Sequence, residues 1–554
     1  MGAGQPERQI MAHKKALINK DIVTDVLLVA IFCSIFTYWF FRDLDSQGIY
    51  SDVALVGSAA LSVKNNTPDY YYANASLNFL GKEIPLMLND YNAATDIYAA
   101  IPWVYIYGNK PIALNIPGFI WGLLAILVMY PLCFRLFNSR LCSALALSML
   151  VTSPTFIIAA RIGLYTGNLT IFFSLLSVFL LFLWQEKKKK IWLFFMGLSL
   201  GTALSGKIQF LWFIDAILVY IAITKKTRRD FFILKNIFVF AIGMLIGALS
   251  FILGNITGHF LSFIFFSKYA FISRTGIHNF NYFFNFMERF KETISLINST
   301  ALRSSAEYPN YLGIYLFCIG AVFIAIMAVY KRAREQKSKE DNSSLPILIF
   351  IFIIAQSPFT MTYFDVHHMI ILLPFMFLAA VFPVYVMFKS FASWLLRLLG
   401  AGVLLLSILF IVHNCRLLID YKAYRNIHSG EELKWNVLPD VIRFLGDEGI
   451  KEIGLGDTGM NDAILFLTNF SLGTEEIFYA PYKSSPKQKQ EELFINRLNK
   501  EKEGYYLFRA EEGAWIHYYP DFRKLVSACG KNIELFKEFQ APGGRVVYRL
   551  YKVY

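Results

Sequence analysis

The sequence is poor in cysteine, with six cysteines in 554 residues, and no two of them form a C-x-x-C pair. They are scattered at Cys33, Cys133, Cys142, Cys318, Cys415 and Cys529, and most of them lie in or beside apolar segments. This pattern is typical of packing residues. It implies neither a disulfide framework nor a metal site built on cysteine pairs.

The chain also lacks an internal repeat and a low-complexity segment. Its N-terminal stretch, residues 1–20, is polar and basic. The apolar segment that follows is too long for the core of a signal peptide, and no small-residue cleavage site comes after it. We therefore expect the first apolar segment to remain in the protein as a membrane anchor.

Apolar residues are abundant. The chain is 56% hydrophobic and 17% aromatic, with a mean hydropathy of +0.46, whereas soluble domains are about 45–50% apolar. The excess comes in long blocks such as 24–41, 232–254 and 397–414. A helix needs about 20 apolar residues to cross about 30 Å of hydrocarbon. These blocks predict a polytopic α-helical membrane protein.

The net charge of +13 could suggest a nucleic-acid partner, but the position of the basic residues argues against one. They cluster in short loops between apolar blocks, at 14–20, 135–140, 187–190, 225–229, 331–339 and 389–397. Short basic loops stay in the cytoplasm. Placing all of them there predicts about 11 spans, or up to about 13, with the N-terminus in the cytoplasm and the C-terminus outside.

This topology divides the chain into three parts. We expect a cytoplasmic N-terminus at 1–23, a transmembrane domain at 24–418 with long outer loops at 42–113 and 256–308, and a small extracytoplasmic α/β domain at 419–554. Within the first outer loop, 93–108 is apolar but interrupted by Asp96 and Pro102, which favours an interfacial helix over a span. In the last part, 438–449 reads as an amphipathic helix and 451–457, 504–510 and 545–553 read as strands.

Ionisable residues from separate segments gather at the outer side in this topology. They include Asp52, Asp90, Asp96, Arg161, Lys207, His367 and His368. An ionisable group at a membrane boundary is costly, and is therefore a candidate for function. The set indicates an anion site with at least one carboxylate beside it.

Four segments in this order resemble a known family. They are 50-YSDVALVGSAAL-61, the block 96–163, 201-GTALSGKIQF-210 and 367-HHMIILLPFMFLAAV-381. Over about 24–415, the chain resembles the GT-C glycosyltransferases, and within them family 39, which holds the protein O-mannosyltransferases and the bacterial aminoarabinose transferases that modify lipid A. The resemblance implies a GT-C fold and transfer of a sugar from a polyprenyl-phosphate donor to a hydroxyl group.

Such a transfer needs a base for the acceptor's proton and stabilisation of the leaving phosphate. The resemblance implies Asp52 as the base; a helix cap or a solvated carboxylate is the alternative. Asp90 or Asp96 could supply a second carboxylate that orients the acceptor or binds a metal, although loop carboxylates are usually solvated. A divalent metal stays open, and no cofactor is certain.

Arg161 and Lys207 are the expected phosphate clamp, because a guanidinium fork and an ammonium both suit phosphate. Snorkelling of these side chains towards lipid headgroups is the alternative. His367 and His368 could donate hydrogen bonds to the phosphate, but adjacent side chains on a helix point apart and ligate one metal poorly together. The Phe-rich stretch 260–286 is a candidate for contact with the lipid tail, or simply a pair of interfacial helices.

The sequence thus predicts an inverting integral membrane glycosyltransferase of a bacterial inner or plasma membrane. Its partners would be an undecaprenyl- or dolichyl-phosphate sugar, a lipid, glycan or protein acceptor on the outer face, and membrane lipids, with no nucleic acid. A transporter or flippase would need paired polar residues at mid-membrane and two similar halves, whereas here the charges gather on one side. A non-catalytic envelope scaffold remains a second alternative.

Overall fold

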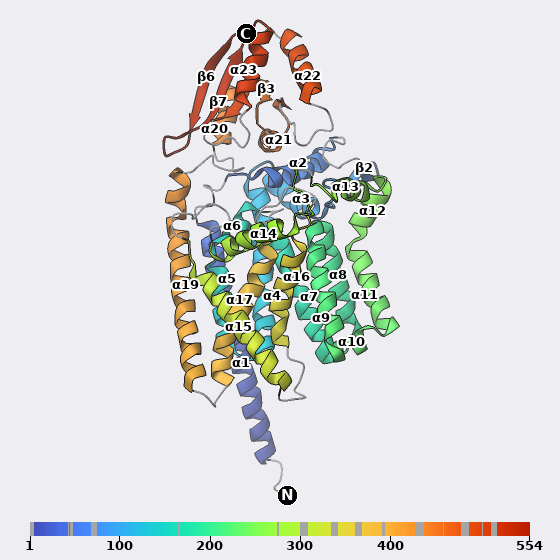
Figure 1. The fold of residues 1–554 in the computed structure, drawn as a ribbon, viewed down its shortest axis with the longest axis vertical. Coiled ribbons are helices and arrows are strands. Elements are labelled where there is room, and N and C mark those ends of the chain that lie inside the picture. The colour runs from blue at the N-terminus through green and yellow to red at the C-terminus, as the bar shows by residue number, and fades with distance from the viewer. Residues whose placement is uncertain are drawn as a thin grey trace.

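A computed structural model of the chain describes residues 5–42, 44, 48–67, 75–163, 167–273, 276–299, 309–333, 342–360, 368–389, 394–427, 437–457, 459–477, 487–500, 502–510 and 518–554. The molecule is a bundle of long helices with a small α/β domain at one end (Figure 1). Short helices lie between the bundle and that domain, and the two termini lie at opposite ends of the molecule.

Among the described residues, six helical stretches are long and apolar enough to cross a membrane. They lie in α1 (Gln5–Phe41), α4 (Ile112–Phe137), α7 (Asn168–Lys187), α15 (Leu312–Ala333), the run of η5 (Ile370–Leu372), α17 (Leu373–Ala380) and α18 (Phe382–Lys389), and α19 (Trp394–Ile427). Three bent pairs raise the number to nine when each is one span: α5 (Arg140–Val151) with α6 (Pro154–Ile162), η2 (Ile208–Phe210) and α9 (Leu211–Ile223) with α10 (Lys225–Phe231), and α11 (Leu234–Gly247) with α12 (Leu249–Thr257).

Two shorter apolar helices complete the bundle: α8 (Lys190–Gly206) and α16 (Leu345–Gln356), which follows η3 (Asn342–Ser344). They are too short to count among the six to nine helices of the described residues that could cross a membrane. The helical membrane architecture predicted from the sequence is confirmed.

The helices differ in how much of their surface other helices cover. In the most apolar stretch of α7, 78% of the residues are buried, and in that of residues 370–387 the share is 89%. The buried share is only 17% in α1 and 22% in α19. Large apolar side chains such as Phe238 and Leu405 are exposed on the peripheral helices. An apolar outer surface of this kind fits contact with lipid. The protein is an integral membrane protein.

Helices α8 and α11 pack unusually closely because each presents two glycines four residues apart. A Cβ atom on Gly201 of α8 would lie 2.2 Å from the carbonyl oxygen of Met244, and one on Gly243 of α11 would lie 2.1 Å from that of Phe194. Gly197 and Gly247 show the same close approach. Small residues at this spacing let the backbones of membrane helices touch. The contact fixes α8, whose end carries Lys207.

Several short elements lie at the bundle end that faces the C-terminal domain (Figure 1). They are α2 (Ser51–Asn65), the antiparallel hairpin of β1 (Ser76–Phe79) and β2 (Lys82–Pro85), α3 (Thr95–Tyr107), α13 (Leu261–Tyr269) and α14 (Tyr282–Ile297). The helix α3 falls within the segment 93–108 expected to be interfacial, and it is too short to span a membrane. The hairpin was not expected from the sequence.

The C-terminal domain contains, in its described part, a five-stranded sheet with strand order β4-β3-β5-β7-β6. The strands are β3 (Glu452–Leu455), β4 (Gly473–Glu476), β5 (Gly504–Arg509), β6 (Ile533–Gln540) and β7 (Val546–Val553), and the helices are α20 (Leu438–Asp447), α21 (Asn461–Thr468), α22 (Lys487–Lys500) and α23 (Tyr519–Ala528). Strand β3 is parallel to β4 and β5, and β7 is antiparallel to β5 and β6. The predicted small α/β domain is confirmed.

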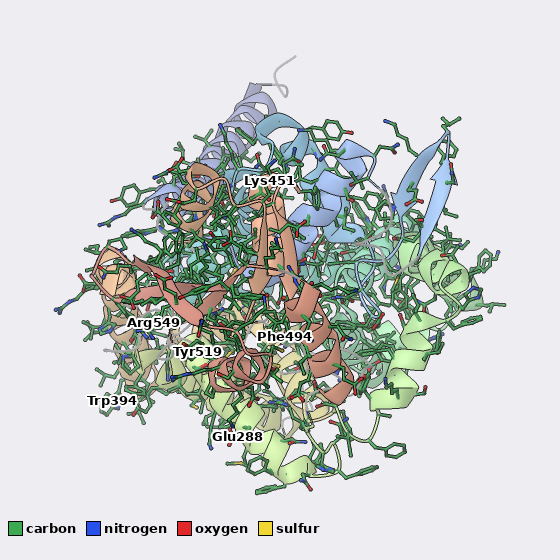
Figure 2. The ribbon with its side chains drawn as sticks, turned by 90° about the horizontal axis from the view of Figure 1, so that it is seen from above. Glu288, Trp394, Lys451, Phe494, Tyr519 and Arg549 are labelled. Atoms are coloured by element: carbon green, nitrogen blue, oxygen red, sulfur yellow. The ribbon has the colours of Figure 1, made fainter. Side chains whose placement is uncertain are left out.

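One hydrophobic core joins this domain to the bundle. It contains Val53 and Ala60 of α2 together with Ile464 and Phe466 of α21. Viewed from above, Lys451, Phe494 and Tyr519 of the domain lie in front of the bundle (Figure 2). The C-terminal domain is therefore packed onto α2 and does not hang from the last helix alone.

Candidate active site

The opening turn of α2 carries Asp52, which is half-buried. The middle of α2 carries small residues, because α4 and α21 both approach it closely. A Cβ atom on Gly57 would lie 2.8 Å from the side chains of both Leu114 in α4 and Phe466 in α21. An acidic residue in the first turn of a helix also interacts favourably with the helix dipole. Asp52 is thus held at the junction of bundle and C-terminal domain.

Helices α2 and α3 pack side by side. Near the end of α2, the Lys64 ammonium donates a hydrogen bond to the carbonyl oxygen of Val104, near the end of α3, over 3.2 Å. The two C-terminal ends therefore lie together. The opening turns, which carry Asp52 and Asp96, accordingly lie towards the other end of the pair.

Asp96 and Lys207 line the same pocket, and both are buried, with 5% and 7% of their surfaces exposed. Burial raises the pKa of Asp96 to about 7, and the positive charge of Lys207 acts in the opposite direction. Burial disfavours a charged carboxyl, while a nearby cation favours it. The pocket therefore holds an ammonium beside a carboxyl group that titrates near neutral pH.

The backbone around Lys207 is tied to the first long loop. The amide of Ala93 donates to the carbonyl oxygen of Ser205 over 2.9 Å, and the amide of Ile208 donates to Oδ1 of Asn92 over 3.4 Å. Lys207 itself follows the last residue of α8 in an extended conformation, before η2 begins. Both sides of the break are anchored, so the lysine has a defined position beside Asp96.

The remaining walls of the pocket are Trp121, Gly163, Gly167, Asn168, Leu169, Thr170 and Gly206. Nε1 of Trp121 and Oδ1 of Asn168 are buried and have no hydrogen-bond partner among the described residues. Buried polar atoms without partners are rare in proteins. They give the pocket a donor and an acceptor that a ligand could meet.

A carboxyl group of the C-terminal domain also lies near Asp52. Asp462, in the first turn of α21, is half-buried, and its backbone carbonyl accepts a hydrogen bond from Oγ of Ser58 over 3.0 Å. Burial raises the pKa of Asp462 to about 7, with further increases from the charges of Glu476 and Asp52. The sequence analysis missed this residue, as it missed Trp121 and Asn168.

Arg161 lies apart from the pocket walls. Its guanidinium donates to the carbonyl oxygens of Trp39, Phe40 and Arg42 at the end of α1, with 3.1 Å between Nε and the oxygen of Phe40. The last carbonyl groups of a helix lack partners within the helix. These contacts give Arg161 a capping role at the end of α1.

The other residues singled out in the sequence are less closely grouped. Asp90 is half-buried and outside the pocket walls, and its backbone carbonyl accepts a hydrogen bond from Ser262 of α13 over 2.8 Å. His368 is half-buried just before η5, whereas His367 lies outside the described residues. Within the described part of the chain, no group of three or more His, Cys, Asp or Glu side chains could hold a metal ion.

The Phe-rich stretch exposes aromatic side chains beside α13 and α14. Phe263 is 64% exposed, and Phe280 and Phe283 are each 75% exposed. These helices lie at the bundle end next to the C-terminal domain (Figure 1). Exposed aromatic rings are typical of the membrane–water interface, so this surface suits contact with lipid chains.

Comparison with known proteins gives one family match and several similar structures. Residues 99–254 match the family model for dolichyl-phosphate-mannose-protein mannosyltransferase. No curated protein sequence matches the chain at a significant level. The matched block contains α4 to α8 and thus most of the pocket, including Trp121, Asn168 and Lys207.

The similar structures are glycosyltransferases. ArnT from Cupriavidus metallidurans bound to undecaprenyl phosphate has a TM-score of 0.59 at 12% identity, over 95% of this chain and 97% of that chain. The Archaeoglobus fulgidus oligosaccharyltransferase in its apo form has a TM-score of 0.53 at 10% identity, over 88% of this chain and 69% of that one. The resemblance expected from the sequence is confirmed: the chain has the fold of the GT-C glycosyltransferases and matches the mannosyltransferase family model over residues 99–254.

Proposed function

We propose that the protein transfers a sugar from a polyprenyl-phosphate donor to a hydroxyl group of a lipid, glycan or protein acceptor. The observation that carries the proposal is the buried pocket that holds Asp96 and Lys207. Its helix α3 packs against α2, whose first turn carries the half-buried carboxylate Asp52. A base and a cation are the two groups that such a transfer needs.

The proposed step is a single displacement. The acceptor oxygen attacks the anomeric carbon and gives its proton to Asp52, while the bond between that carbon and the phosphate oxygen breaks. The bonding electrons leave with the polyprenyl phosphate, whose negative charge Lys207 stabilises. Because attack and departure occur on opposite sides, the anomeric configuration inverts. A product that retains the donor's configuration would contradict this mechanism.

The other residues take supporting roles in the proposal. Asp96 is the second carboxylate and keeps Lys207 in place, and Trp121 and Asn168 bind hydroxyl groups of the sugar. His367 and His368 are candidates for hydrogen bonds to the phosphate. Arg161 supports the site through its contacts with the end of α1. Asp90 is less well placed for the second carboxylate, because it lies outside the pocket walls.

The comparisons support the donor class. A structurally similar protein is described with undecaprenyl phosphate bound, and the archaeal oligosaccharyltransferase has been described with a tethered acceptor peptide, which is a protein-type acceptor. Placing the basic loops in the cytoplasm puts the C-terminal domain, and the site below it, on the outer face of a bacterial inner or plasma membrane.

The test uses the purified full-length protein in detergent with a panel of radiolabelled polyprenyl-phosphate sugars and a membrane extract as acceptor. We expect at least one donor to release free polyprenyl phosphate only when the acceptor is present. In proteoliposomes, movement of labelled donor across the bilayer without any release would overturn the proposal in favour of a flippase.

A further inference from the structure

We propose that the hairpin of β1 and β2 rests one apolar face on the lipid bilayer, at the leaflet on the side of the C-terminal domain. The partner is the lipid surface itself, with its acyl chains and headgroups. The hairpin lies outside the walls of the candidate pocket, so this proposal does not depend on the transfer reaction.

The register of the two strands divides the hairpin into two faces. Leu77 lies opposite Ile84, and Phe79 lies opposite Lys82. Because side chains alternate between the two faces of a strand, these four share one face, and three of them are apolar. The pairs on the other face are mainly polar: Ser76 with Pro85, and Asn78 with Glu83.

The apolar face is left open by the rest of the protein. Phe79 is 61% exposed, and Leu80 at the tip is 88% exposed. A two-stranded hairpin by itself is only marginally stable in water, and clustered exposed apolar side chains mark an interaction surface. The apolar face therefore requires a partner outside this chain.

The turn at the tip indicates an apolar partner. The loop between the paired residues consists of Leu80 and Gly81, with φ values of 52° and 76°. A two-residue loop with positive φ at both positions is a type I′ turn, which favours Asn-Gly. Gly81 fits this preference, whereas Leu80 has an unfavourable backbone conformation and an exposed side chain. Contact with lipid accounts for a leucine at this position.

The base of the hairpin packs on α12. Oγ of Ser250 donates to the carbonyl oxygen of Leu86, directly after β2, over 2.8 Å. A Cβ atom on Gly254 would lie 2.5 Å from Cγ of Met87. These contacts fix the hairpin to the helices that form this edge of the bundle.

The surface of that edge is apolar up to the hairpin. Ile256 of α12 and Phe263 of α13 are both more than half exposed, as is Phe238 of α11. The hairpin lies beside α12 and α13 (Figure 1), and seen from above it projects outwards from the edge of the molecule (Figure 2). Its apolar face thus continues the lipid-facing surface of the bundle, which identifies lipid as the partner.

The composition of the face also fits the depth of the membrane–water interface. Backbone groups at the free edges of a two-stranded ribbon are costly in the hydrocarbon core. Lys82 is exposed beside Phe79, and a lysine lays its stem along an apolar surface while its ammonium reaches polar groups. Phe79 and Leu80 would therefore contact acyl chains, and Lys82 would contact headgroup phosphates.

Contact with the bilayer would also hold the loop that leads to the pocket. The amide of Ala94 donates to the carbonyl oxygen of Leu86 over 3.0 Å, and the hydroxyl of Tyr98 donates to that of Pro85. Asp96 lies between these two donors in the sequence. The hairpin thus connects the membrane surface to the segment that carries Asp96.

The test is photo-cross-linking of the full-length protein in vesicles of phosphatidylethanolamine and phosphatidylglycerol. The photoreactive residue p-benzoylphenylalanine replaces Phe79, and mass spectrometry measures the yield of lipid adducts after irradiation. Phe238 is the lipid-facing reference, and Asn78, exposed on the opposite face, is the matched control. We expect the yield at Phe79 to approach that at Phe238 and to exceed that at Asn78 several-fold.

A second variant tests the tip. Leu80→Asn gives the turn its favoured Asn-Gly sequence, so the hairpin should stay folded while the tip loses its contact with acyl chains. The yield of lipid adducts at Phe79 should then fall several-fold. An unchanged yield would contradict the role of Leu80.

Lipid adducts at Phe238 with only background at Phe79, or equal yields at Phe79 and Asn78, would overturn the proposal. Cross-links from Phe79 to a second copy of the protein, in place of lipid, would also overturn it. If the replacement at Phe79 lowers the melting temperature, the same photoreactive residue at Leu80 decides. The experiment needs no sugar donor, so its result and the fate of the proposed function are separate.

Discussion

Replacement of Lys207 by methionine tests the pocket most informatively, because its effect on stability depends on pH. The wild-type pKa of Asp96 is raised to about 7 by burial, even with Lys207 beside it. Removing the ammonium raises that pKa further. At about pH 6 the carboxyl is mostly neutral in both proteins, so the substitution should cost little through this pair.

Above neutral pH the two proteins diverge. Wild-type Asp96 ionises beside Lys207, whereas the variant must either keep its proton or bury an unpaired charge. The free-energy difference grows by about 1.4 kcal/mol for each pH unit above the wild-type pKa, until the raised pKa of the variant is reached. Both side chains are less than 10% exposed, so solvent screens this effect little.

The assay is the melting temperature of the purified protein in detergent at about pH 6 and about pH 8, with Asp96→Asn/Lys207→Met as the control. The double variant lacks the carboxyl, so its melting temperature should not fall further at about pH 8 than at about pH 6.

The transfer activity of the double variant should stay low, because the donor phosphate still lacks its cation. A hydrogen bond to a charged group contributes about 1.5–3 kcal/mol, which corresponds to a roughly 10- to 160-fold loss of kcat/KM. Equal losses of melting temperature at both pH values would refute the coupling of Asp96 to Lys207, and recovery of activity in the double variant would refute the phosphate role of Lys207.

Three further changes test other parts of the structure. Gly201→Leu should overpack the contact between α8 and α11 and destabilise the protein by about 1–3 kcal/mol, whereas Gly402→Leu, with open space around its Cβ, should leave the melting temperature nearly unchanged. Trp121→Phe removes Nε1, a donor that has no partner among the described residues, so we expect KM for the donor to rise several-fold with little change in melting temperature. Arg161→Met removes hydrogen bonds to the end of α1, so at about pH 6 it should lower the melting temperature more than Lys207→Met does. A decrease in melting temperature equal to or smaller than that of Lys207→Met would contradict the capping role.

The helical membrane architecture could be predicted from the sequence because the bilayer sets the length of an apolar run. Lys207 lies at the break between α8 and η2. The loop 135–140 used for topology has a further role, since Arg140 lies 3.0 Å from Asp21 and 2.6 Å from Asp25 of α1. The pairing of Arg140 with α1 requires the three-dimensional arrangement and could not be read from the charge pattern.

Only part of the candidate site could be predicted from the sequence. Lys207 and Asp96 were noticed because charges are rare in apolar surroundings, but their sharing of one pocket depends on how the first long loop folds onto α8. Trp121 looks like a packing residue, and only the structure shows that its Nε1 has no partner in the described chain. Asp462 lies in a different domain from Asp52, so nothing in the local sequence pairs them.

The central claim is that Asp52 accepts the acceptor's proton during transfer from a polyprenyl-phosphate sugar. Its most direct test is the rate at which wild type and Asp52→Asn release free polyprenyl phosphate in a single turnover, with Asp440→Asn as the control. The expected result is a loss of about 100- to 10,000-fold in Asp52→Asn at an unchanged melting temperature, because general-base catalysis contributes rate factors of that size. Release at the wild-type rate in Asp52→Asn would contradict the claim and move the base to another carboxylate, with Asp96 the first to examine.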